Sequence, residues 1–201
     1  MLLDVDDCQL VLVDYQEKLM PVIHEREQVL ANAVRLAQLA RLMEVPVFGT
    51  EQNPQRLGPN APALRELCDR TLAKMSFSAV PDGLLDWLRP PAKPQQGRNA
   101  RSLPKHLQKP VQAEPERPTV VIAGCEAHVC LLQTALELLE EEMDVWVVTD
   151  ACGSRTERNR DAAFDRLAGA GAELVTTEMV AFEWLRSCEH PAFKSMLELV
   201  K

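Results

Sequence analysis

The sequence of 201 residues contains no apolar run of the roughly 18 residues that a membrane-spanning helix needs. Basic residues are also in short supply, with 22 Lys and Arg against 30 Asp and Glu and a formal net charge of −8. This balance argues against nucleic acid and anionic lipid as partners, because both attract Lys and Arg. The N-terminus, MLLDVDDCQ, carries acids where a secretory signal would carry basic residues, so we expect a cytoplasmic protein.

Length and composition indicate an ordinary globular protein. Apolar residues make up 46% of the chain and charged residues 26%. A chain of this length most simply forms one domain, 1–201, whose core needs no disulfides or metal for stability. Its six cysteines are scattered, and in a reducing compartment we expect them to be thiols, most of them small buried side chains.

Short apolar runs alternate with segments of helical periodicity. Strands are predicted at 8–15, 46–50, 71–78, 118–124, 144–151 and 172–178. Helices are predicted at 28–44, 61–69, 83–89, 157–171, 178–187 and 191–200. A further helix, which begins at Cys130 after the fourth strand, carries Leu132, Ala135, Leu136, Leu139 and Met143 on one stripe. This alternation predicts a single-domain, three-layer α/β/α fold of Rossmann-like type, with a six-stranded and mostly parallel sheet between the helices.

Residues 90–118 interrupt the alternation. They are rich in Pro, Gln and basic residues and contain few large apolar side chains. Because such a composition buries little surface, we expect a long exposed loop inserted between the third helix and the fourth strand. A solvated excursion is the favoured interpretation, and a lid over a site is the alternative, since long loops are sometimes functional.

Reactive side chains follow three of the predicted strands. In an open parallel sheet the ligand site lies beyond the carboxyl ends of the strands. Asp14 ends the first strand, Lys74 lies in the irregular third strand, and Cys130 follows the fourth. Each is weak evidence alone, because such residues are commonly a cap, a solvated cation and a packing residue. Together they form a consistent set for nucleophilic catalysis.

The chemistry expected of this set is attack by a thiolate. Cys130 begins a predicted helix, where the helix dipole and a nearby cation lower the pKa of a cysteine from about 8.5 to ~3.5–7.5. Asp14 would accept the thiol proton as general base, and Lys74 would stabilise the resulting charges. The backbone N–H groups of Glu126 and Cys130 are the candidate donors to the oxyanion.

The segment GCEAHVC (124–130) has two other interpretations. A zinc site built from Cys125, His128 and Cys130 is disfavoured, because structural zinc sites use pairs such as C-x2-C with a second pair elsewhere. A redox pair is also disfavoured, because four residues rather than two separate the cysteines. A nucleophile turn is therefore the favoured interpretation, with Cys125 as a buried turn residue.

Three motifs resemble the isochorismatase-like cysteine hydrolase superfamily, which includes nicotinamidases and N-carbamoylsarcosine amidase. They are VLVDYQ (11–16), the Lys of TLAKMSFS (71–78), and IAGCEAHVCLLQTALELL followed by VWVVTDACGSR. The motifs occur in the family's order and spacing, and the last two are most similar to the isochorismatase domain-containing branch. The resemblance covers nearly the whole chain apart from 90–118.

This resemblance implies a six-stranded parallel sheet and a catalytic triad of Asp14, Lys74 and Cys130. It also implies a cis peptide at Cys125–Glu126, which would direct the N–H groups of Glu126 and Cys130 at one oxyanion. Members of the family tend to form homo-oligomers, so at least a dimer is expected.

Departures from the family narrow the activity. Nicotinamidases hold a metal through an Asp-x-His pair and a further His, but TEQNPQRLGP (50–59) contains no histidine, so we expect no metal and no cofactor. True isochorismatases generally lack the nucleophile, so Cys130 argues against a vinyl ether substrate. The expected activity is hydrolysis of a small amide, ureide or related acyl C–N compound through a thioacyl-enzyme. The alternative is a non-catalytic, oligomeric interaction protein that retains the fold.

Five further residues are candidates for the substrate pocket, each with a simpler structural interpretation. Gln16, Glu51 and Gln52 lie at or just past strand ends, where they would contact substrate or cap neighbouring loops. Phe77 would form an apolar wall of the pocket or pack in the core. His128 would act as an auxiliary acid–base group or bond to backbone in the first helical turn.

Overall fold

The structure is a computed structural model that describes residues 2–90 and 117–201. Most of the predicted insertion at 90–118 lies outside the described residues, so its interpretation as loop or lid stays a prediction. The strands are β1 (Cys8–Val13), β2 (Val47–Gln52), β3 (Arg70–Lys74), β4 (Thr119–Gly124), β5 (Asp144–Val148) and β6 (Glu173–Val175). The helices are α1 (Arg26–Leu42), α2 (Pro54–Leu57), α3 (Pro62–Arg65), α4 (Leu84–Leu88), α5 (Leu132–Glu140), α6 (Glu157–Gly169), α7 (Thr177–Leu185) and α8 (Phe193–Val200).

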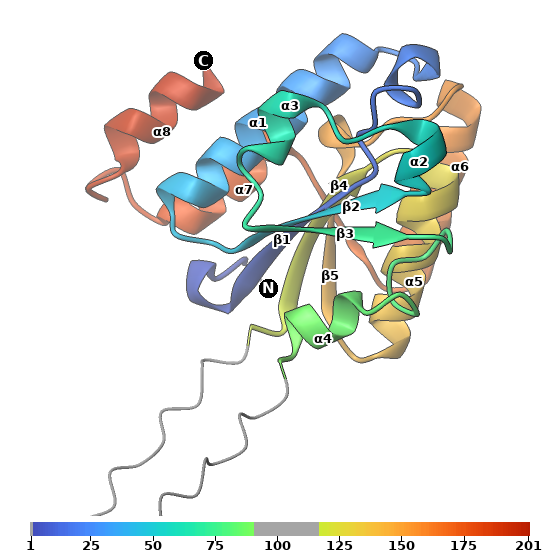
Figure 1. The fold of residues 1–201 in the computed structure, drawn as a ribbon. Helices are drawn as coiled ribbons and strands as arrows, with labels where there is room; N and C mark the ends of the chain where they lie inside the picture. Colours follow the sequence, from blue (N-terminus) through green and yellow to red (C-terminus); the bar gives the residue numbers. More distant parts are fainter. Residues whose placement is uncertain (1, 91–116) are drawn as a thin grey trace, which may run out of the picture.

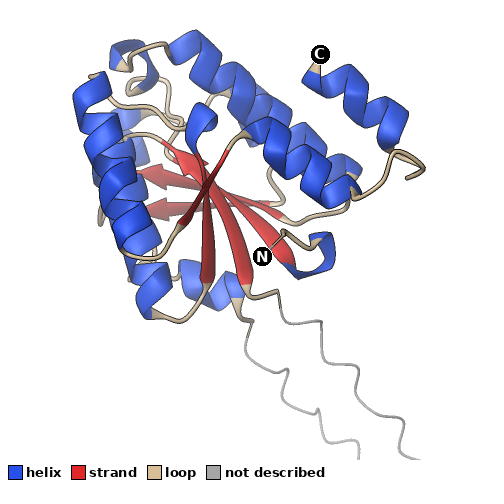
Figure 2. Cartoon of the chain, turned by 180° about the vertical axis from the view of Figure 1, so that it is seen from behind, coloured by secondary structure: helices blue, strands red, loops and turns tan. Residues whose placement is uncertain are grey.

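All six strands lie in one sheet, in the order β3-β2-β1-β4-β5-β6, and every neighbouring pair is parallel. Helices α1 and α7 cover one face of the sheet, and α5 and α6 cover the other (Figures 1 and 2). The three-layer α/β/α prediction is therefore confirmed. No helix in the described ranges has both the length and the apolar character needed to cross a membrane.

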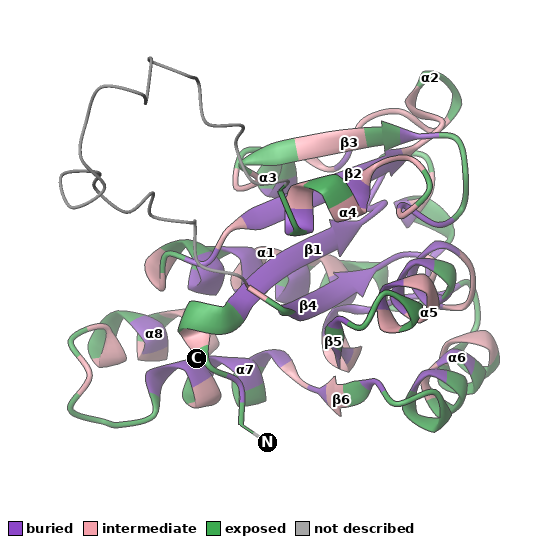
Figure 3. Ribbon diagram, turned by 90° about the horizontal axis from the view of Figure 1, so that it is seen from below, coloured by how far each residue is buried: buried purple, intermediate pink, exposed green. Residues whose placement is uncertain are grey.

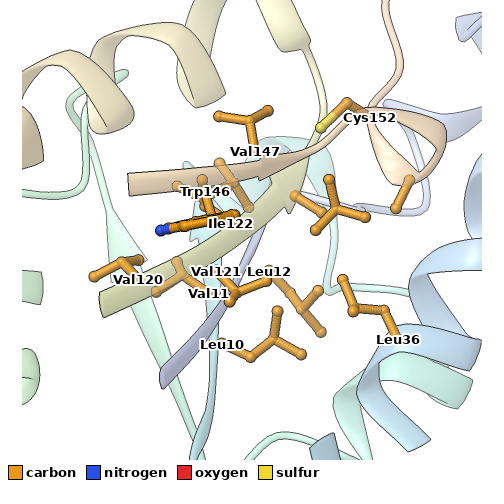
Figure 4. Close-up of a cluster of buried hydrophobic side chains, with 14 of the residues drawn as sticks. Leu10, Val11, Leu12, Leu36, Val120, Val121, Ile122, Trp146, Val147 and Cys152 are labelled. Atoms are coloured by element: carbon orange, nitrogen blue, oxygen red, sulfur yellow. The ribbon is translucent and has the colours of Figure 1, made fainter. Parts of the chain in front are cut away.

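The core is centred on β1 and β4, the two middle strands. Every residue of both strands is buried (Figure 3), as expected for a parallel sheet with helices on both faces. This burial explains why their sequences, CQLVLV and TVVIAG, are continuous apolar runs rather than alternating ones. Leu10 and Leu12 of β1 lie toward Leu36 of α1, while Val121 and Ile122 of β4 extend the same cluster (Figure 4).

The order of the strands creates a switch point between β1 and β4. From β1 the chain builds β2 and β3 on one side, and then crosses to build β4, β5 and β6 on the other. Val13 and Gly124 are paired at the carboxyl ends of β1 and β4. A Cβ atom on Gly124 would lie 2.5 Å from the Val13 carbonyl oxygen, so only glycine allows this close approach. Ligands of open α/β sheets bind at such a switch point.

Four predicted strands end earlier than expected, at Val13, Lys74, Val148 and Val175. β1 stops at Val13, because Asp14 adopts a left-handed backbone conformation with φ of 54°. β3 stops at Lys74 rather than at residue 78. The residues that follow fold around the end of the Lys74 side chain, because the Ser76 and Phe77 carbonyls accept hydrogen bonds from its ammonium. The short helix α2, which begins with Pro54, was not predicted.

Candidate active site

Asp14 provides a carboxylate at the switch point. Its side chain is fully buried, and its two oxygens have different partners. One oxygen accepts from the Thr50 hydroxyl at 2.7 Å, and the other accepts from the Lys74 ammonium at 2.7 Å. The left-handed backbone at Asp14 redirects the chain out of β1, and such sparsely populated conformations cluster at functional sites.

Lys74 carries its ammonium group to the same place from the end of β3. The charged end of this side chain is shielded from water, with no exposed side-chain surface on either Lys74 or Asp14. Besides Asp14, the ammonium donates to the Phe77 carbonyl at 2.8 Å and to the Ser76 carbonyl at 3.2 Å. These three acceptors match the three N–H donors of a lysine, which is the condition for burying such a charge.

Cys130 completes the group from the segment that follows β4. It is 7% exposed. Burial raises the pKa of the Cys130 thiol to about 12, with the Asp14 carboxylate acting in the same direction and the Lys74 ammonium opposing it. The predicted acidic thiolate is therefore wrong for the resting site. The reason is that Cys130 lies within the π-helical turn Ala127–Leu131, buried beside carboxylates, rather than exposed at the first residue of a helix.

The turn before Cys130 has the backbone geometry that the family resemblance implies. The Cys125–Glu126 peptide is cis. The Glu126 carbonyl accepts from the N–H groups of Val129 and Leu131, and the Ala127 N–H donates to the Gly153 carbonyl. Among the described residues, nothing accepts a hydrogen bond from the Glu126 N–H. That N–H is one of the two predicted oxyanion donors, and the role stays a prediction.

The predicted pocket residues at the strand ends bind neighbouring loops. The Gln16 amide is buried and donates to the carbonyls of Gln52 and Gly58, while its oxygen accepts from the Gln52 N–H. Glu51 is also buried, and its carboxylate accepts from the Asn60 N–H at 2.8 Å. Both match the capping interpretation, and a contact between any of these residues and substrate stays a prediction.

Phe77 is not packed in the core, because it is 52% exposed. Its backbone carbonyl accepts a hydrogen bond from the Lys74 ammonium. Met75, two residues earlier, is 67% exposed, so two apolar side chains project from the loop that holds the Lys74 ammonium. A role for the Phe77 ring as a wall of the pocket stays a prediction.

His128 faces the loop after β5 and helix α6. Its Nδ1 atom lies 2.9 Å from the Ser154 hydroxyl, and its Nε2 atom lies 3.4 Å from the Asn159 amide nitrogen. Both ring nitrogens therefore have side-chain partners, in place of the backbone partner that the sequence suggested.

Thr50 and Thr134 are contacts that sequence reasoning missed. Thr50 binds Asp14, and the Thr134 hydroxyl donates to the Cys130 carbonyl at 2.7 Å. Their signal in the sequence is weak: Thr50 lies on a strand beside β1, and Thr134 is one helical turn after Cys130. Neither position distinguishes a functional threonine from a packing one.

The site contains sulfur, carboxylate and ammonium groups but no metal-binding cluster. Within residues 2–90 and 117–201, no group of three or more His, Cys, Asp and Glu side chains is arranged to hold a metal ion. All six cysteines are free thiols. The arrangement itself supports nucleophilic chemistry, with a thiol, a carboxylate able to accept its proton, and an ammonium that compensates the negative charge.

The fold and the site define an α/β protein built like a hydrolase, with its reactive groups at the switch point of a parallel sheet. The isochorismatase domain model matches residues 8–179. Isochorismatase domain-containing protein 2 of Homo sapiens is 36% identical over 192 residues, which span 96% of this chain and 82% of that protein. The chain therefore belongs to the isochorismatase family.

Solved structures share the fold of this chain. A Caenorhabditis elegans structure described as MAR1 ribonuclease is 29% identical, with a TM-score of 0.82, and the match covers 100% of this chain and 92% of that one. An Escherichia coli structure described as an octameric hydrolase of unknown specificity is 26% identical, with a TM-score of 0.81, covering 99% and 89%.

Proposed function

We propose that the protein is a cysteine hydrolase that cleaves a small amide, ureide or related acyl C–N compound through a thioacyl-enzyme. The observation that carries this proposal is the buried Asp14–Lys74 pair beside the Cys130 thiol. A buried ion pair contributes little net stability and is expensive to desolvate. A buried ion pair beside a thiol is explained if the pair accepts the proton of the Cys130 thiol during the reaction.

The first half of the proposed reaction forms the thioacyl-enzyme. The Cys130 thiol gives its proton to Asp14 as the sulfur attacks the substrate carbonyl carbon. The N–H groups of Glu126 and Cys130 donate to the oxyanion of the tetrahedral intermediate. Asp14 then returns the proton to the substrate nitrogen, the C–N bond breaks, and ammonia or an amine leaves.

The second half regenerates the thiol. A water molecule gives a proton to Asp14 as its oxygen attacks the thioester carbonyl. The new tetrahedral intermediate collapses, the C–S bond breaks, and the proton passes from Asp14 to the Cys130 sulfur. The product is a carboxylic acid, or a carbamic acid from a ureide.

Lys74 compensates one negative charge both before and after the proton moves. In the resting site its ammonium faces the Asp14 carboxylate at 2.7 Å. When the proton moves from Cys130 to Asp14, the same ammonium faces a thiolate and a neutral acid. The net charge near Lys74 does not change, so the transfer needs little reorganisation of the surroundings.

The balance of charge favours an uncharged substrate. Asp14 is paired with Lys74, and the Glu126 carboxylate is paired with the Arg155 guanidinium at 2.7 Å. No charge of either sign is left in excess by these two pairs. A neutral amide or ureide fits such a site without an added desolvation cost.

The test is hydrolysis of a panel of neutral primary amides and ureides, measured as release of ammonia or amine. Wild type is compared with Cys130→Ala and with Cys188→Ala, which removes an exposed thiol and serves as the matched control. Activity that is lost only in Cys130→Ala supports the proposal. No turnover by wild type across the panel favours the non-catalytic interaction protein.

RNA cleavage is a separate arm of this test, because one structural neighbour is described as a ribonuclease. The net charge of −8 argues against that activity here. Cleavage of a mixed-sequence RNA by wild type, retained in Cys130→Ala, would contradict the proposed function.

We also propose that the chain forms a homo-oligomer in the cytoplasm. One structural neighbour is described as octameric. Leu2, Met179 and Phe182 are exposed apolar side chains around a groove of about 520 Å³ beside α7, and such patches mark association surfaces. Sedimentation velocity tests the assembly: wild type should be larger than a monomer, and Phe182→Glu should lower its mass if this surface is used.

A further inference from the structure

The carbonyl groups that hold Lys74 belong to a short loop, residues 75–80, which we call the lysine loop. Ser76 and Phe77 accept hydrogen bonds from the Lys74 ammonium. At the start of the loop, the N–H groups of Met75 and Ser76 donate to the Asp82 carboxylate at 3.5 and 3.2 Å. The position of the ammonium therefore depends on where this loop lies.

Helix α5 anchors the other end of the lysine loop. The Ser78 hydroxyl donates to the Glu137 carboxylate at 2.6 Å. The Ala79 N–H donates to the Thr134 hydroxyl at 3.1 Å, in a buried contact. Thr134 and Glu137 are three residues apart, so they lie on the same face of α5 and hold two successive residues of the loop.

The Thr134 hydroxyl also contacts the nucleophile's own backbone. It accepts from the Ala79 N–H and donates to the Cys130 carbonyl at 2.7 Å. Thr134 is fully buried, so water does not replace either bond when one is lost. A single hydroxyl thus links the turn that presents Cys130 to the loop that holds Lys74.

We propose that Thr134 is a positioning residue that fixes the distance between the Cys130 thiol and the Asp14–Lys74 pair. This inference rests on the proposed function. Valine has nearly the shape of threonine but neither donates nor accepts, so Thr134→Val removes one donor to the Cys130 carbonyl and the acceptor of the Ala79 N–H. The lysine loop then separates from α5, and the thiol moves away from the Asp14 carboxylate.

Thr134→Val should slow hydrolysis and speed alkylation of Cys130. Loss of alignment slows hydrolysis, and a displacement of about 1 Å at a reacting group can cost roughly a hundredfold in rate. Alkylation of Cys130 by iodoacetamide needs only the thiolate. It becomes faster, because burial and the Asp14 carboxylate, which together raise the pKa of Cys130 to about 12 in the wild type, both weaken.

The experiment compares wild type with Thr134→Val, Thr134→Ser and Thr177→Val. Serine keeps the hydroxyl, so Thr134→Ser is the conservative rescue. Thr177 is a buried threonine whose hydroxyl donates to Asp150 at 2.9 Å, outside the triad, so Thr177→Val controls for the stability lost with a buried hydrogen bond. Each variant is assayed for kcat and KM on the best amide and for the rate of Cys130 alkylation against pH.

We expect Thr134→Val to lower kcat by about tenfold or more with little change in KM. Its alkylation profile should move to lower pH by about 0.5, a threefold faster reaction at pH 8. Thr134→Ser and Thr177→Val should leave both readouts near wild type. An unchanged alkylation profile and kcat in folded Thr134→Val, or equal changes in Thr177→Val, would overturn the inference.

A second variant covers a failure of Thr134→Val to fold. Glu137→Ala removes the neighbouring anchor of the lysine loop from a partly exposed position and should shift both readouts in the same direction by a smaller factor. Wild-type readouts in that variant would then overturn the inference. The alkylation arm needs no substrate. It therefore decides the role of Thr134 even if no amide is hydrolysed, an outcome that would count against the proposed function alone.

Discussion

Removing one member of the Asp14–Lys74 pair should cost far more stability than removing both. Lys74→Met leaves the Asp14 carboxylate fully buried, with the Thr50 hydroxyl as its remaining side-chain partner. Breaking a buried ion pair in this way costs about 3–5 kcal/mol. Asp14→Asn leaves an ammonium without its counter-charge, and we expect a loss of the same size.

The double variant Asp14→Asn/Lys74→Met carries no buried charge. Replacing both partners of a buried pair is often neutral or stabilising. Against this, the Ser76 and Phe77 carbonyls lose their donor, at about 1–3 kcal/mol for a buried group. We therefore expect a net loss below about 3 kcal/mol, less than either single variant and far from the sum of the two.

Urea unfolding and thermal unfolding, both followed by circular dichroism, measure these differences in stability. For a chain of this size each kcal/mol lowers Tm by about 2–4 °C, so the single variants should melt about 6–20 °C below wild type. Losses that add in the double variant, or single variants within about 1 kcal/mol of wild type, would refute the account of the pair as buried and mutually dependent.

Three further predictions concern the pKa of Cys130, the close approach of β1 and β4, and the Thr50 hydroxyl. The Asp14 carboxylate helps to raise the pKa of Cys130 to about 12, so Asp14→Asn should lower that pKa and speed alkylation of Cys130 at pH 8. Peptide mass spectrometry measures the rate, and slower alkylation would contradict this prediction. Gly124→Ala should destabilise the protein by about 1–3 kcal/mol, because its Cβ would lie 2.5 Å from the Val13 backbone. The Cβ of Gly169→Ala in α6 meets nothing within 4 Å, so this variant should gain up to ~1 kcal/mol of stability. Equal melting temperatures of the two variants would contradict this prediction. Thr50→Val should lose about 1.5–3 kcal/mol through its bond to Asp14, and Thr50→Ser should recover most of that loss in the same unfolding assay.

Much of the sheet and the place of the site could be predicted from the sequence. The apolar runs of β1 and β4 are long and uninterrupted, because both strands are covered on both faces. Asp14 follows β1 directly, Cys130 lies in the turn after β4, and Lys74 ends β3. The rule that parallel strands present their carboxyl ends to one edge is sufficient to bring these residues together.

The direction of the Cys130 pKa could not be predicted in the same way. The sequence indicates that a helix follows β4, but not that Cys130 would be buried within a π-helical turn beside Asp14. Desolvation then outweighs the attraction of Lys74. The sequence does not distinguish the two possible roles of Gln16 and Glu51 for a related reason: their partners are loop backbone groups whose position depends on tertiary structure.

The most direct test of the central claim is the order in which thiols react with two reagents. With iodoacetamide at pH 8, the exposed Cys188 should react before Cys130, whose pKa is about 12. With 4-nitrophenyl acetate the order should reverse, because attack on a carbonyl uses Asp14 as base and the oxyanion donors. Peptide mass spectrometry should then find the acetyl group first on Cys130, with a burst of 4-nitrophenolate that Cys130→Ala abolishes. Acetylation of Cys188 with Cys130 left unmodified would contradict the assignment of Cys130 as the nucleophile.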